Sequence, residues 1–188
     1  MKRRAEMGVG TLIIFIALLL VAAVAAGVLI QTAGSLQQKA LSTGTQATGQ
    51  ISTNAVVLEV SAQDGRSTGT LDNISMIMKL APGSEPIKLD DVTMTLSTVN
   101  STQTLTYRAG NPTGDTDDFG VTYLQVGPNN QTGVIVRGDV IEVNMQASRE
   151  LVDSEFVRIS FIPKIGTTTL TEFYMPDVIS TKRVYLYP

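Results

Sequence analysis

Few side chains in this 188-residue chain can carry out chemistry, because it contains no Cys, no His and no Trp. It therefore lacks a thiol nucleophile, a histidine general base and the commonest zinc ligands. A serine or aspartate enzyme would miss its usual partners, so we expect neither catalysis nor a cofactor. The formal net charge of −3 also argues against a broad nucleic-acid-binding surface.

One acidic loop is a candidate for binding Ca²⁺. The stretch GDTDDFG collects Asp115, Asp117 and Asp118 between glycines, and carboxylate oxygens are calcium ligands. An EF-hand loop needs further ligands and a closing Glu, which this stretch lacks. A solvated acidic loop is the preferred interpretation, and we predict no metal site.

Three asparagines fit the acceptor pattern Asn-x-Ser/Thr for glycosylation: Asn73, Asn100 and Asn130. Asn73 is expected on the outer face of a strand, and the other two are expected in turns. The pattern predicts a glycoprotein modified at one or more of these positions.

A long apolar segment precedes all of these residues. Leu12–Ile30 contains no charged or polar side chain, and about twenty such residues cross a bilayer as a helix. Lys2, Arg3 and Arg4 lie just before the segment, so the positive-inside rule keeps the N-terminus in the cytoplasm. A cleaved secretory signal is the alternative, with the stretch AVAAG as its cleavage site.

The pattern of this helix indicates lateral assembly. Ala22 with Ala26, and Ala23 with Gly27, are small-residue pairs that allow close approach of helices, although a simple anchor rich in alanine explains them too. An apolar stripe continues through the polar stretch to Ile51, which predicts a helix about 70 Å long. That length exceeds a bilayer.

From Ala55 onward the hydrophobic period changes from helical to two. In the stretch NISMIMKL, for example, one face carries Ile74, Met76, Met78 and Leu80, and the other carries Asn73, Ser75 and Lys79. Eight or nine such segments are separated by turns, among them QDGRSTG and a hairpin turn at Arg137–Asp139. The pattern predicts an antiparallel β-sandwich.

The N-terminal stretch MGVGTLIIFIALLLVAAVAAGVLIQTAG closely resembles the start of the archaellins, the archaeal flagellins. These proteins have a short basic leader, a Gly-x-Gly-Thr-Leu motif, an apolar helix and a polar helical extension. The motif falls here on Gly8, Gly10, Thr11 and Leu12. The resemblance implies an α+β chain, in which a long N-terminal hydrophobic helix precedes an all-β immunoglobulin-like antiparallel sandwich.

The resemblance also implies processing. A prepilin-peptidase-like enzyme would cut between Ala5 and Glu6, where Ala5 is a tolerated small alternative to the usual Gly. Residues 1–5 would be the leader, 6–54 the helix that is membrane anchor and then filament core, and 55–188 the outer domain.

The function implied is that of a structural subunit of the archaeal motility filament, the archaellum, exported from the cytoplasmic membrane. Its expected partners are further copies or paralogous subunits, an oligosaccharyltransferase, and the archaellum membrane platform and motor. Two alternatives remain open: an adhesion pilin, and a membrane-retained accessory or stator protein with an immunoglobulin-like domain. An anchored extracellular enzyme is disfavoured by the missing His and Cys.

Overall fold

The computed structural model describes residues 2–63, 71–179 and 181–188. The chain divides into two compact units, Met1–Ala47 and Thr48–Pro188. The first is helix alone, and the second contains the last helical turn and the strands. Most of the predicted turn QDGRSTG, residues 64–69, lies outside the described residues.

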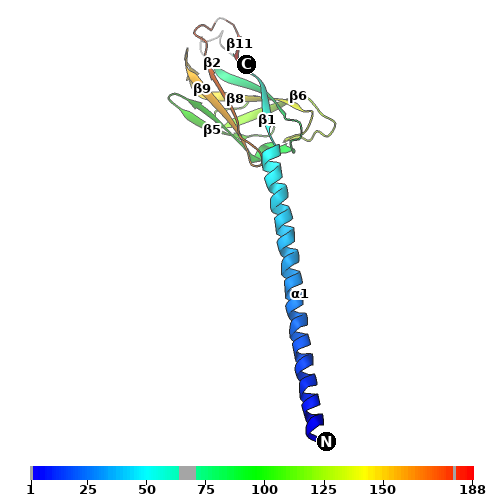
Figure 1. Cartoon of the computed structure of the whole chain (residues 1–188). Helices are drawn as coiled ribbons and strands as arrows, with labels where there is room; N and C mark the ends of the chain where they lie inside the picture. The colour runs from blue at the N-terminus through cyan, green and yellow to red at the C-terminus, as the bar shows by residue number, and fades with distance from the viewer. Residues whose placement is uncertain (1, 64–70, 180) are drawn as a thin grey trace. The chain divides into compact units, whose positions relative to one another are not determined.

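The helix α1 spans Lys2–Ser52 and confirms the long helix predicted from the hydrophobic pattern (Figure 1). Alanine and leucine, which have high helix propensity, are the commonest residues of its first half, and the chain has no proline before Pro82. The Thr53 N–H still bonds the Gly49 carbonyl at 3.0 Å, and strand geometry begins at Ala55.

The second unit is built mainly from antiparallel strands, as the alternating pattern predicts. Within the described residues, nine strands form one sheet in the order β10-β9-β4-β5-β6-β8-β2-β1-β11, and β3 and β7 form a separate pair. The strand bounds are β1 Ala55–Gln63, β2 Leu71–Leu80, β3 Ile87–Lys88, β4 Val92–Thr98, β5 Thr102–Tyr107, β6 Asp118–Gln125, β7 Val134–Ile135, β8 Val140–Leu151, β9 Phe156–Pro163, β10 Thr169–Tyr174 and β11 Arg183–Tyr187. A 3₁₀ turn, Leu89–Asp91, precedes β4.

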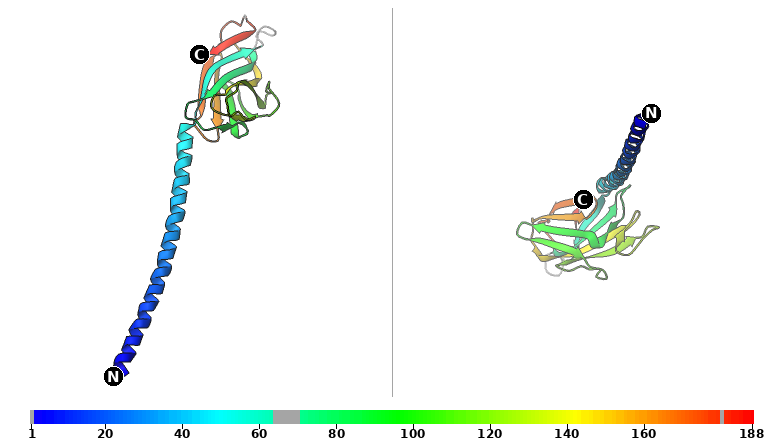
Figure 2. Two further views of the ribbon diagram at one scale, coloured as in Figure 1. Left: turned by 90° about the vertical axis from the view of Figure 1, so that its right-hand side faces the viewer. Right: turned by 90° about the horizontal axis from the view of Figure 1, so that it is seen from below.

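The long sheet folds back on itself around one hydrophobic core, and Figure 2 shows the β unit from two further sides. The inward residues of β2 and β8 alternate along each strand, and those of β4 and β9 do the same from the other part of the sheet. All of them are buried: Ile74, Met76, Met78, Ile141, Val143, Met145, Val92, Met94, Leu96, Val157, Ile159 and Phe161. The β unit therefore contains its own core.

One strand pair departs from the predicted antiparallel arrangement. Strands β5 and β6 run parallel, with Tyr107 opposite Phe119, and a loop between them returns the chain to the same end. The loop packs so tightly that a methyl group on Gly120 would lie 2.1 Å from the Asn111 carbonyl oxygen. Glycine is required there because no larger side chain fits.

The turn predicted at Arg137–Asp139 is present, but its assignment to a hairpin is wrong. Strand β7 pairs with β3, whereas β8 pairs with β2 and β6, so the turn joins two different sheets. The buried Asp139 carboxylate holds this turn by accepting the N–H groups of Gly127 at 2.6 Å and Val136 at 3.0 Å. The sequence could not show this because the strand partners are distant along the chain.

A part-buried ion pair fixes the turn between β8 and β9. Glu155 is 6% exposed; its carboxylate pairs with Arg149 and accepts the Val152 N–H at 3.1 Å. The Arg149 guanidinium also donates to Thr98 Oγ1 at 3.1 Å, which ties β8 to the end of β4. Losing one partner of such a pair leaves the other charge desolvated and uncompensated.

We predict that Glu155→Gln destabilises the β unit by about 2–3 kcal/mol, because the Arg149 charge loses its partner. The matched control is Glu172→Gln, which breaks an exposed pair with Arg158 and should cost less than about 1 kcal/mol. Urea unfolding followed by tyrosine circular dichroism measures this, because all five tyrosines lie in the β unit. Equal losses in the two variants would contradict the assignment.

Candidate assembly interface

The side chains of α1 have almost no partners within the chain. From Met7 onward nearly every helical residue is exposed, including Leu20 at 64% and Leu29 at 68%. Within the described residues, this is the one helix long and apolar enough to cross a membrane. Because so large an apolar surface is unfavourable in water, lipid or other protein chains must cover it.

Several hydroxyl side chains of the helix donate to its own backbone, which suits a dry environment. Thr11 Oγ1 donates to the Gly8 carbonyl at 2.9 Å, and Thr32 Oγ1 donates to the Leu29 carbonyl at 3.0 Å. Ser35 makes an equivalent bond at 2.9 Å. Hydroxyls paired within the helix can enter an apolar interior without an unsatisfied donor.

Five glycines of α1 have no close neighbour inside the isolated chain. A methyl group would meet nothing within 4 Å at each of five positions: Gly8, Gly10, Gly27, Gly34 and Gly44. Each glycine costs about 1 kcal/mol relative to alanine in a helix. Close approach of another helix would offset this cost.

The predicted packing residues and the processing site lie along this helix. Ala22, Ala23, Ala26 and Gly27 are all exposed, so the chain alone does not pack them. Residues 2–5 of the predicted leader lie in the first turn of α1. The side chains of residues 1–6 lie outside the described set. Both predictions concern interactions with other proteins.

The end of α1 is fixed by a polar clamp that sequence reasoning missed. Ser84 Oγ accepts the Asn54 N–H at 3.0 Å, and Thr53 Oγ1 accepts the Glu85 N–H at 3.2 Å. The Thr167 N–H bonds the Thr53 carbonyl at 2.9 Å. Thr53 and Ser84 are both buried. The only sequence signal is polar residues directly after the helix, which is too common a pattern to identify a clamp.

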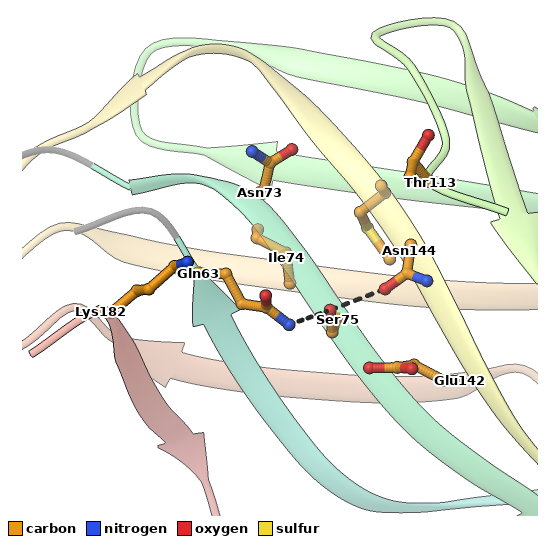
Figure 3. A pocket seen from close by; sticks show the side chains of 9 residues that line it. Gln63, Asn73, Ile74, Ser75, Thr113, Glu142, Asn144 and Lys182 are labelled. Atoms are coloured by element: carbon orange, nitrogen blue, oxygen red, sulfur yellow. Dashed lines mark hydrogen bonds between the residues drawn. The ribbon is translucent and has the colours of Figure 1, made fainter. Parts of the chain in front are cut away.

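The three predicted glycosylation sites differ in accessibility. Asn100 is exposed in the bend between β4 and β5, whereas the Asn130 side chain donates to the buried Asp139 carboxylate at 3.3 Å. Asn73 lies within β2 and donates to Asp72 at 3.2 Å. Figure 3 shows Asn73 among the side chains that line a cavity of about 410 Å³. Only Asn100 among the three is both exposed and outside a strand.

Two of the three carboxylates in the predicted acidic loop have partners within the chain. Asp118 pairs with Arg108 at 3.1 Å, and Asp115 accepts the Thr116 N–H at 2.8 Å. Within the described part of the chain, no three acidic or other ligand side chains converge to hold a metal ion. Asp115 and Asp117 lie in the loop, and Asp118 begins β6.

Two solved structures share this architecture. The archaeal flagellum of Methanospirillum hungatei strain JF1 matches with a TM-score of 0.74 over 96% of this chain and 99% of that chain, at 20% identity. The crystal structure of archaeal flagellin FlaB1 from Methanocaldococcus jannaschii matches with a TM-score of 0.64 over 71% of this chain and 96% of that chain, at 17% identity. At these identities the likeness shows the fold, and it confirms the predicted helix followed by an antiparallel β unit.

Sequence relatives show the family. Flagellin B3 of Halobacterium salinarum is 34% identical over 95% of this chain and 92% of its own length. Flagellin B1 of Thermoplasma volcanium is 42% identical over 68% of this chain, which spans 55% of that relative. The model of the family archaeal-type flagellin matches residues 5–173. The chain therefore belongs to the archaeal-type flagellins.

Proposed function

We propose that this flagellin is a structural subunit of the archaeal motility filament, with α1 in the filament core and the β unit on the outer surface. The observation that carries the proposal is that α1 exposes an apolar surface on all sides while its hydroxyls bond within the helix. The β unit, which has a complete core of its own, needs no such cover.

Assembly supplies what the isolated helix lacks. Burial of apolar surface stabilises by about 25 cal/mol per Å², and identical helices can cover one another along the whole apolar segment. Contacts between unlike surfaces of identical subunits do not have to close into a ring, so they generate an open helical polymer. The family membership supports this function over an adhesion pilin, a stator protein or an anchored enzyme.

The same helix would first hold the precursor in the membrane. Lys2, Arg3 and Arg4 retain the N-terminus on the cytoplasmic side, and cleavage between Ala5 and Glu6 by a prepilin-peptidase-like enzyme removes all three cations. The mature helix then leaves lipid for the filament core. A separate membrane platform and motor would assemble and rotate the extracellular filament, since this chain has no Walker-type phosphate-binding motif.

We predict that Ala5→Leu blocks processing, because a bulky side chain replaces the small residue before the cut. The variant should keep its full-length mass, stay in the membrane fraction and form no filaments. Ala5→Gly is the matched control and should be processed normally. Mass spectrometry of the secreted protein checks the bond, and a mature chain starting anywhere other than Glu6 would contradict it.

The small-residue face predicts a position-dependent assembly defect. Ala26→Leu should strongly reduce filament yield, because Ala26 and Ala22 mark the face where helices approach closely. Ala25→Leu adds the same volume outside that face and should be tolerated. Both changes leave the span apolar, so membrane insertion serves as the folding control. Filaments are counted by negative-stain electron microscopy. Equal filament yields from the two variants would refute the assignment of Ala22 and Ala26 to the packing face.

Among the three predicted acceptors, we infer that Asn100 carries a glycan attached by an oligosaccharyltransferase. Asn100→Gln should lower the mass of the secreted subunit by one glycan, whereas Asn73→Gln and Asn130→Gln should leave the mass nearly unchanged. Intact-protein mass spectrometry measures this difference. A glycan retained after Asn100→Gln would overturn the assignment.

A further inference from the structure

Lys39 is the sole charged residue of α1 between Met7 and Ser52. Its side chain is exposed in the isolated chain. In a bundle of identical helices every copy brings the same cation, and these helices offer no carboxylate nearby. Glu6 lies about 50 Å away along the helix. An ammonium group taken out of water without a partner is costly, so packed helices need a carboxylate from elsewhere.

Glu85 is a carboxylate in a suitable place. It follows Ser84 in the polar clamp, and a methyl group on Gly49 would lie 3.2 Å from Glu85 Oε2, so the carboxylate lies beside the last turn of α1. Its side chain is exposed. The ion pairs found within the described residues do not include Glu85. Asp91, on the following 3₁₀ turn, is already paired with Lys164 at 3.4 Å.

Helix geometry relates these two residues in neighbouring subunits. Lys39 precedes Gly49 by ten residues, which corresponds to about 15 Å along the helix. Packed helices lie about 8–10 Å apart, a gap that a lysine side chain can cross. A neighbour displaced by about 15 Å along the helix axis therefore brings its Lys39 level with Gly49. At the same displacement Gly34 of one helix is level with Gly44 of the other, which suits close approach.

We infer that Lys39 of one subunit forms an ion pair with Glu85 of a neighbouring copy of this chain. The pair neutralises Lys39, which is the one cationic side chain of the helix once the leader has been removed. It also selects the axial displacement between two neighbours, because apolar contacts alone tolerate sliding whereas a single charge pair does not. The inference rests on the proposed assembly through α1.

Site-specific cross-linking tests the pair directly, because the chain has no native cysteine. In filaments of the Lys39→Cys/Glu85→Cys variant, a short bis-maleimide should join neighbouring chains into a ladder of multimers on a denaturing gel. The same variant dissociated in detergent should stay monomeric. The matched control is Lys39→Cys/Asp90→Cys, since Asp90 is also exposed but lies five residues further along.

Exchange of the two charges provides the second test. Lys39→Glu should reduce filament yield by about tenfold or more, because two carboxylates then face each other. Lys39→Glu/Glu85→Lys should restore the yield, and Lys39→Glu/Asp90→Lys should not.

Two cross-linking results would overturn the inference: no ladder of multimers, or an equal ladder from the Asp90 control. Equal filament yields from Lys39→Glu/Glu85→Lys and Lys39→Glu/Asp90→Lys would also overturn it. If the wild-type chain forms filaments but the Lys39→Cys/Glu85→Cys variant gives no ladder, only this pair is rejected. A wild-type chain that forms no filaments rejects the proposed function itself.

Discussion

The whole molecule depends on one constraint: the apolar surface of α1 cannot stay in water. The apolar side chains of α1 are exposed, several of its glycines cost stability, and the Thr11 and Thr32 hydroxyls bond its own backbone. These features become favourable only when other helices or lipid surround α1. The proposed function supplies two such environments in turn, first the bilayer and then the filament core.

The β unit meets the opposite requirement, because it must be stable while it faces solvent. It folds a long sheet around its own core, and buried polar groups such as Asp139 and Glu155 hold the turns between strands. The clamp around Thr53 and Ser84 binds the last helical turn and the following residues into this unit. The helix end is therefore a defined part of the domain.

The sequence predicts most of the fold because its hydrophobic periodicity is strong and local. The period of two in β2 places Met76 and Met78 in the core as expected. It does not predict the parallel pairing of β5 with β6 or the role of Asp139, since both depend on contacts between distant segments. The proposed assembly residues could be predicted only as a pattern, because the chain alone leaves Ala22, Ala23, Ala26 and Gly27 exposed.

A helical reconstruction of purified filaments by cryo-electron microscopy would show directly what surrounds α1. We expect chains that begin at Glu6, with residues 12–30 of every subunit surrounded by equivalent helices and with the β units facing solvent. A chain that is found only as a membrane-retained monomer, or filaments whose core contains lipid around separated helices, would contradict it.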